Sequence, residues 1–192
     1  MISRWRNLLI PLVCLVPVLT VGIALAEQER AGSRFLLAGY GFTHTWLGGT
    51  RTWVETADLV GRYETVLLPQ QGDSLLRGYH SLFLELPLHL VLDPATEPMI
   101  GLNFLAAWTF TGFGKMRPYL FAGGGPLYTR ADIPGLGAHL NGNYQLGCGV
   151  RTRLQKGNDL IIEYRFHHIS NGSRMAPNDP LNSGKLLVGI TF

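Results

Sequence analysis

Cysteine is scarce in this chain, and the patterns of helical and nucleic-acid-binding proteins are missing. The sequence contains 2 cysteines, Cys14 and Cys148. Only Cys148 follows the apolar N-terminal segment, which excludes an intramolecular disulfide in a processed chain. The net charge is only +3, too small a surplus for a nucleic-acid-binding surface. Long helical periodicity is absent, and beyond residue 26 no stretch is apolar enough for a transmembrane helix.

The N-terminus has the composition of a secretory signal peptide. Arg4 and Arg6 precede an almost uncharged apolar run, and Ala24-Leu25-Ala26 matches a cleavage site. The alternative is a transmembrane anchor, because the run is long enough to span a bilayer, but two prolines interrupt it. We therefore predict a signal peptide over residues 1–26 and one domain over residues 27–192. Removal of Arg4 and Arg6 lowers the net charge from +3 to +1.

Alternating polar and apolar residues, broken by turn residues, fill the remaining sequence. This pattern predicts an all-β fold, an eight-stranded antiparallel transmembrane β-barrel, because bacterial outer-membrane barrels have an even number of strands. Eight strands enclose a lumen that side chains fill, here with a polar plug. The alternative is a soluble barrel of the lipocalin kind, with its apolar face turned inward. The expected strands cover residues 35–46, 59–68, 77–92, 99–111, 117–129, 140–154, 159–170 and 183–192.

Two compositional features refine this prediction. The run Gly123-Gly124-Gly125 is expected at a bend or bulge, where a strand needs close backbone approach. The larger aromatic residues suit the interfacial girdles of a barrel rather than a cofactor site. These aromatic residues are Trp46, Trp53, Trp108, Tyr119, Tyr128 and Tyr164.

The segment from Asp159 to Ser170 holds the candidate chemistry. Because side chains alternate across a strand, its even-numbered residues share an apolar face that ends in His168 and Ser170. These two Cα atoms should lie roughly 6.6 Å apart on one face, so the side chains can form the hydrogen-bonded base and nucleophile that an active serine needs. The odd-numbered residues Glu163, Arg165 and His167 should instead form a buried ion-pair network in the lumen.

The sequence His168-Ile169-Ser170-Asn171-Gly172, followed by Pro177-Asn178-Asp179 and a final strand ending in Phe192, resembles the active-site segment of the outer-membrane lipid A 3-O-deacylases. The resemblance extends more loosely over most of the mature chain. It implies an eight-stranded barrel that removes the acyl chain ester-linked at the 3 position of lipid A, using a serine, a histidine and a carboxylate. The position expected to hold the carboxylate is occupied by Asn182.

This resemblance implies a set of site residues and partners. His168, Ser170 and Asn182 are the predicted catalytic residues, with Asp179 as an alternative to Asn182. Asn171, Gly172 and Asn178 are candidates for positioning or for an oxyanion site. The expected partner is lipid A, or lipopolysaccharide, in the outer leaflet of a bacterial outer membrane. The oligomeric state stays open, a homodimer included.

The sequence indicates no metal or cofactor site but leaves two alternative functions. The remaining histidines, His44, His80 and His89 among them, lack the spacing of metal ligands, so neither a metal nor another cofactor is predicted. A non-catalytic or lipid-binding barrel of the same family is the main alternative function, favoured by the amide at position 182. Hydrolysis of another outer-leaflet ester is a third.

Overall fold

The computed structural model describes residues 32–154 and 157–192. The predicted signal peptide and the first residues of the predicted mature domain lie outside this range. Within it, no helix is both long and apolar enough to cross a membrane.

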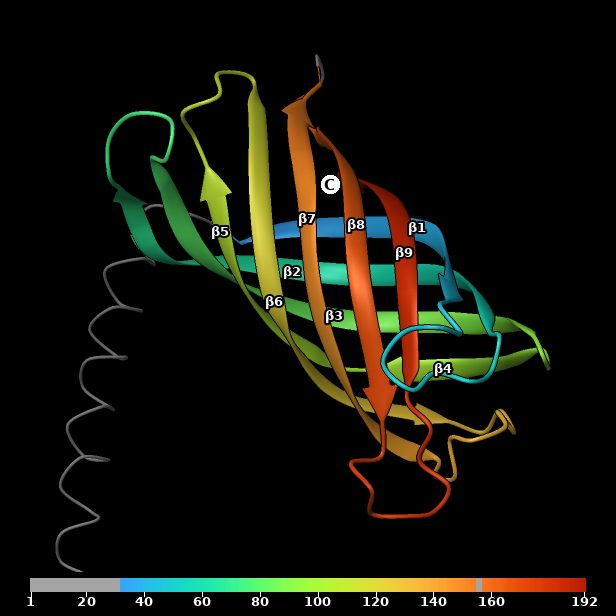
Figure 1. Cartoon of the computed structure of the whole chain (residues 1–192). Helices are drawn as coiled ribbons and strands as arrows, with labels where there is room; N and C mark the ends of the chain where they lie inside the picture. The colour runs from blue at the N-terminus through green and yellow to red at the C-terminus, as the bar shows by residue number, and fades with distance from the viewer. Residues whose placement is uncertain (1–31, 155–156) are drawn as a thin grey trace, which may run out of the picture.

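The chain folds into a closed antiparallel β-barrel (Figure 1). In the described part of the chain, nine strand segments form eight strands of the barrel, because β4 and β5 pair with the same neighbours, β3 and β6, and are separated only by Leu102. The first and last strands pair with each other and close the ring. The segments are β1 (Ser33–Thr43), β2 (Glu55–Gln71), β3 (Gly78–Asp93), β4 (Glu97–Gly101), β5 (Asn103–Phe110), β6 (Met116–Thr129), β7 (Leu140–Arg153), β8 (Asp159–Ser170) and β9 (Leu181–Thr191).

The interruption at Leu102 lies beside the run of three glycines in β6. A Cβ atom on Gly125 would lie 1.9 Å from the carbonyl oxygen of Leu102, and one on Gly123 would lie 2.2 Å from that of Phe104. The two backbones approach more closely than any side chain allows. The expected close approach of two backbones is therefore present, but the pairing register is the same on both sides of Leu102, so the glycines do not mark a bulge.

Alternation along each strand separates an apolar outer wall from a filled lumen. In β8 the odd-numbered residues are buried and the even-numbered ones are at least partly exposed. Leu86, Leu120 and Leu146, each more than half exposed, belong to the outer wall. The exposure of so many large apolar side chains is the arrangement of a barrel solvated by lipid, and it excludes the lipocalin-like alternative.

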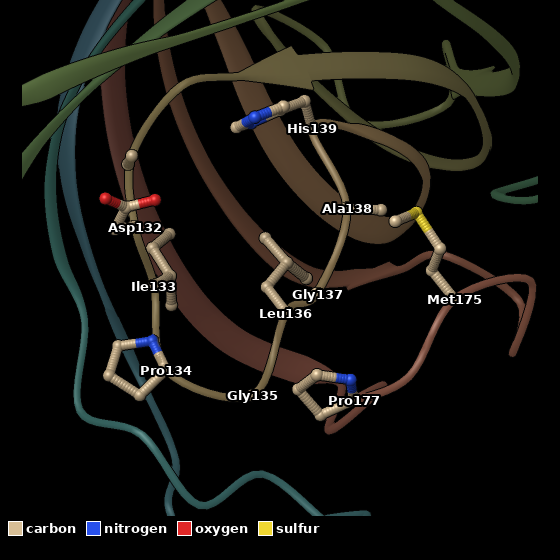
Figure 2. A pocket seen from close by; sticks show the side chains of 11 residues that line it. Asp132, Ile133, Pro134, Gly135, Leu136, Gly137, Ala138, His139, Met175 and Pro177 are labelled. Atoms are coloured by element: carbon tan, nitrogen blue, oxygen red, sulfur yellow. The ribbon is translucent and has the colours of Figure 1, made fainter.

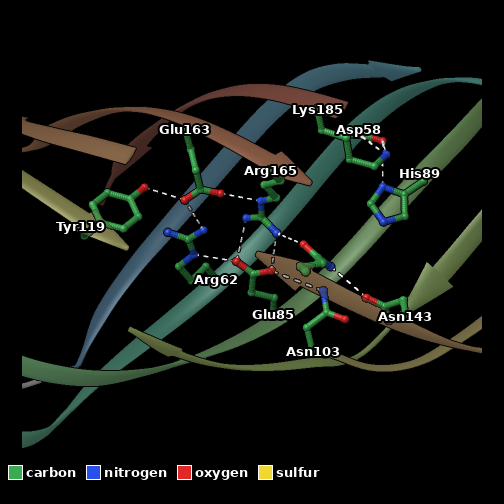
Figure 3. A network of polar contacts seen from close by, with 11 residues as sticks. Asp58, Arg62, Glu85, His89, Asn103, Tyr119, Asn143, Glu163, Arg165 and Lys185 are labelled. Carbon is green, nitrogen blue, oxygen red and sulfur yellow. Dashed lines mark hydrogen bonds and ion pairs between the residues drawn. The ribbon is translucent and has the colours of Figure 1, made fainter. Parts of the chain in front are cut away.

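Charged side chains in the middle of the lumen form a buried network that includes Glu163 and Arg165, as predicted (Figure 3), whereas His167 is buried without a hydrogen-bond partner. Arg62 bonds Glu85 at 2.7 Å and Glu163 at 2.6 Å, and Arg165 bonds both of the same carboxylates. Lys185 forms a second group with Asp58 at 2.8 Å, and the same carboxylate is 2.7 Å from His89. Such pairing compensates the cost of removing these charges from water.

The lumen is less uniformly polar than the sequence predicts. Next to the charged network, buried apolar side chains form a cluster that includes Phe35, Phe83 and Ile161. Tyr119 is only 1% exposed and donates its hydroxyl hydrogen to Glu163. The prediction that Tyr119 belongs to an interfacial girdle was wrong, because the pleat of β6 turns this position inward.

One end of the barrel bears the longer connections and is called here the loop end. Residues 44–54, 130–139 and 171–180 form three of these connections, and outer-membrane barrels place such loops on the extracellular side. Apolar residues from the loops and strand ends close the lumen there, among them Val54, Leu136 and Leu181. The loops are also tied to one another, since Thr52 Oγ1 donates to the Pro134 carbonyl at 2.6 Å and the Asp179 N–H to the Gly135 carbonyl at 2.8 Å.

Candidate active site

His168 and Ser170 lie on the outer wall near the loop end of β8. Both side chains are half-buried, and the distance from His168 Nε2 to Ser170 Oγ is 3.2 Å. Two residues on the same face of a strand have therefore leaned together into hydrogen-bond contact, as the spacing predicts. In this geometry Nε2 can accept the serine proton.

Asn182 occupies the other side of the same imidazole. It is the direct cross-strand partner of His168 in the pairing of β8 with β9, and its Oδ1 lies 2.8 Å from His168 Nδ1. The last strand begins at Leu181, two residues earlier than predicted, so Asn182 is held in the sheet itself. Ser170, His168 and Asn182 thus form a continuous hydrogen-bonded series with the geometry of a nucleophile, a base and an orienting group.

Asp179, the alternative orienting group, belongs to a different set of contacts. Its carboxylate lies 3.7 Å from Arg51, and its backbone N–H is bonded to Gly135. Asn182, rather than Asp179, contacts the histidine.

The three other predicted site residues lie in the loop that follows Ser170. Asn171 is 1% exposed, and its Nδ2 lies 2.8 Å from the Met175 carbonyl and 3.1 Å from that of Leu136. This side chain therefore ties two loops together. Asn178 accepts the Asn171 N–H through Oδ1 at 2.8 Å, while Gly172 is exposed with a positive φ of 65°.

Two further residues complete the surroundings of the site, and the sequence did not indicate either. Thr50, from the first loop, accepts hydrogen bonds from both the backbone N–H and the Nδ2 of Asn182, each at 2.9 Å. Tyr144 pairs with His168 across β7 and β8, with ring centroids 6.2 Å apart. The register of the β7–β8 hairpin could have located Tyr144, whereas the contact of Thr50 depends on the path of a loop.

The other histidines contribute no comparable site. His167 and His89 face the lumen, with ring centroids 5.2 Å apart. His80 packs on Trp108 on the outer wall. Over the described ranges, no three histidine, cysteine or acidic side chains are placed to share a metal ion.

A pocket of about 450 Å³ opens at the loop end (Figure 2), but the candidate site lies outside it. The loop 130–139 forms most of its lining, and Met175 and Pro177 complete it. None of the three hydrogen-bonded residues belongs to this lining. The candidate chemistry is therefore exposed on the barrel wall, toward the surrounding lipid.

The outer wall also contains an apolar groove of about 650 Å³. Tyr164 and Leu186 belong to its lining and pair with each other across β8 and β9. They share the outer face with His168 and Asn182. Four residues separate the two pairs along β8 and along β9, which corresponds to roughly 13 Å. The wall from the site toward the groove is thus apolar.

Comparison with known proteins identifies the family. Residues 33–191 match the profile of the lipid A 3-O-deacylase (PagL) family. The chain belongs to this family. A PagL domain therefore spans the whole described barrel. Proteins of the PagL family are bacterial outer-membrane β-barrels. No curated protein matches the chain.

Two solved structures share the PagL barrel fold with this chain. The crystal structure of the outer membrane enzyme PagL is 15% identical, with a TM-score of 0.56, and the match covers 83% of this chain and 98% of that one. Neisserial surface protein A, NspA, is 14% identical, with a TM-score of 0.55, and covers 83% of this chain and 95% of its own. At these identities the likeness establishes the eight-stranded barrel fold.

Proposed function

We propose that this PagL-family protein is a serine esterase that removes the acyl chain ester-linked at the 3 position of lipid A. One observation carries the proposal: His168 contacts Ser170 through one ring nitrogen and Asn182 through the other, on the lipid-facing wall at the loop end. A nucleophile in this place suits an ester that lies within the outer leaflet. Because all three residues come from one barrel, a single copy of the chain suffices.

The proposed reaction has two stages. His168 Nε2 takes the proton from Ser170 as Oγ attacks the ester carbonyl carbon, and a tetrahedral intermediate forms. The C–O bond to the sugar then breaks, and the histidine gives its proton to the departing sugar oxygen. Water, activated by the same nitrogen, hydrolyses the acyl-serine ester, releasing a fatty acid and regenerating the serine.

The loop after Ser170 is proposed to stabilise the oxyanion of each intermediate. Gly172, whose backbone N–H is the proposed donor, lies on an exposed turn, and Asn178 is fixed by its bond to the Asn171 backbone. Donors held in advance of the reaction stabilise developing charge without reorganising. We assign Asn171 to positioning, because loop carbonyl oxygens occupy its amide hydrogens.

Family membership and the surface around the site support lipid A as the substrate. Lipid A has its acyl esters at the boundary between sugars and hydrocarbon, which is the level of a site at the loop end of the wall. The apolar face that includes Tyr164 and Leu186 continues from the site toward the centre of the membrane. An acyl chain can lie along this face while its ester reaches Ser170.

The decisive experiment is mass spectrometry of lipid A from cells that express the wild type or Ser170→Ala at matched levels of folded barrel. We expect loss of one 3-linked hydroxyacyl chain in the wild type and none in the variant. The control is Ser33→Ala. Ser33 is the exposed first residue of β1, at the end of the barrel away from the site, so this variant should deacylate lipid A like the wild type. Unchanged lipid A in cells with folded wild-type barrel would refute the proposal.

The amide at position 182 favours a second candidate, a non-catalytic or lipid-binding barrel of the same family. An amide supplies no negative charge to an imidazolium. Under this candidate, neither lipid A nor other lipids lose acyl chains, and an active-serine probe fails to label the folded barrel. Free fatty acid without deacylated lipid A would instead indicate another outer-leaflet ester.

A further inference from the structure

The loop between β1 and β2, residues 44–54, contacts the side chain of Asn182 at several points. Its Nδ2 lies 3.1 Å from the Leu47 carbonyl oxygen, 3.4 Å from that of Gly48 and 2.9 Å from Thr50 Oγ1. Thr50 also accepts the backbone N–H of Asn182 at 2.9 Å. Thr50 is 2% and Asn182 4% exposed, so solvent does not compete for these bonds.

These contacts determine which end of the amide faces the histidine. Carbonyl oxygens only accept hydrogen bonds, so Nδ2 must face Leu47 and Gly48. The Oδ1 atom, which also only accepts, is thereby turned toward His168 Nδ1. The reverse orientation would place three oxygen atoms against one another and two N–H groups against the imidazole.

The amide orientation in turn determines the tautomer of His168. Because Oδ1 accepts, Nδ1 must be the protonated nitrogen. A neutral imidazole has one N–H, so Nε2 presents its lone pair to Ser170. A neutral asparagine can therefore orient the base correctly, provided that its amide does not turn over.

We propose that the segment Leu47–Thr50 is a positioning element for the site. The carbonyl oxygens of Leu47 and Gly48 select the orientation of the Asn182 amide, and Thr50 holds Asn182 against them through the two hydrogen bonds that its hydroxyl accepts. The segment thus fixes the Asn182 amide in the one orientation that leaves His168 Nε2 free to accept a proton from Ser170. This inference rests on the proposed esterase function only for its effect on rate. Its effect on the histidine tautomer is independent of any substrate.

The first test reads the tautomer directly. In ¹⁵N NMR spectra of the barrel in detergent micelles, protonated and unprotonated ring nitrogens have well-separated shifts, and His168→Gln identifies the His168 signals. Wild type and Thr50→Ser should show the Nδ1–H form alone. Thr50→Val, which keeps the side-chain shape but removes the hydroxyl, should show a mixture of both tautomers. An unchanged Nδ1–H signal in Thr50→Val would overturn the proposal.

A matched control separates this effect from general loosening of the loop. Thr52→Val removes a hydroxyl from the same loop, one that bonds Pro134 rather than Asn182. It should leave the His168 signals as in the wild type. A mixed tautomer in Thr52→Val as well would mean that loop stability alone sets the tautomer, and would also overturn the proposal.

The second test uses the symmetry of a carboxylate, which has no wrong orientation. With Asn182 present, Thr50→Val should lower kcat about tenfold at unchanged KM, and Thr50→Ser should restore the rate. In an Asn182→Asp background the same change should cost about twofold or less, because two equivalent oxygens accept from Nδ1 either way. Equal factors in the two backgrounds would show a merely structural Thr50. If the wild type has no esterase activity, the proposed function fails and the NMR arm alone decides this inference.

Discussion

Replacing Asn182 by aspartate isolates the one property that this site lacks, a negative charge beside the base. The change exchanges Nδ2 for an oxygen and keeps the hydrogen bond that His168 Nδ1 donates to Oδ1. These two atoms are 2.8 Å apart in the wild type. Opposite charges about 4 Å apart attract by about 4 kcal/mol at an effective dielectric constant of 20. The imidazole is half-exposed, so we expect about a third of this value in the transition state, which corresponds to about a tenfold rise in kcat.

The same substitution should weaken the fold slightly. The new oxygen faces the carbonyl oxygen of Leu47, which lies 3.1 Å from Nδ2 in the wild type. Two donated hydrogen bonds are lost, at about 1 kcal/mol each in unfolding free energy. Rotation of the Thr50 hydroxyl, which then donates to the carboxylate, restores part of this loss.

The assay is release of hydroxyacyl chains from purified lipid A in detergent micelles, quantified by mass spectrometry at equal amounts of folded barrel. Folded protein is measured from the heat-dependent shift in electrophoretic mobility. Asn158→Asp, which makes the same chemical change at the opposite end of the barrel, should leave kcat within about twofold. A tenfold or larger fall in kcat for Asn182→Asp, with the barrel folded, would refute the reasoning, because the amide would then supply something that a carboxylate cannot.

Three further changes test the surroundings of the site and the lumen. Glu85→Gln leaves two buried arginines to share a single carboxylate, that of Glu163, and should lower the unfolding free energy by about 3–5 kcal/mol in urea titrations of the folded barrel; a loss below about 1 kcal/mol would mean that water already solvates this network. Gly48→Ala places a Cβ 2.9 Å from Asn182 Nδ2. This contact should displace the amide that orients His168 and lower kcat about tenfold. Gly114→Ala, with a similar positive φ and open space around it, should strain a turn without affecting the rate, and equal losses would contradict the contact. Tyr144→Ala removes the ring beside His168 and should raise KM about fivefold with little change in kcat, whereas a fall in kcat alone would show that the ring orients the base.

Much of the barrel could be predicted from alternation alone. The segment from Asp159 to Ser170 has the bounds that the sequence predicts, and its charged odd-numbered residues face the lumen. Alternation determines which face a residue occupies but not how far a strand extends. This is why β2 begins at Glu55, four residues before the predicted start. The prediction for Tyr119 was wrong for a different reason, because it followed the residue type, whereas alternation along β6 turns this position into the lumen.

The site was predictable only where it depends on strands. His168 and Ser170 are two residues apart on one strand, and the strand geometry brings them together. The approach of Asn182 to His168 was also predictable, because β8 and β9 are antiparallel neighbours. Thr50 lies 132 residues from Asn182 in the sequence, in a loop whose path is set by contacts with other loops, and no local pattern encodes such a contact.

The position of Ser170 on the outside of the wall changes how turnover would depend on concentration. An enzyme with an internal cleft meets its substrate by diffusion in three dimensions through an opening. Here substrate and products would exchange sideways, within the plane of the leaflet. The relevant concentration is then the mole fraction of lipid A among its neighbours, and diluting the substrate with an inert amphiphile should slow turnover even at constant bulk concentration. Membrane fluidity and lateral packing would thus control access to the serine in the way that a lid does in a soluble hydrolase.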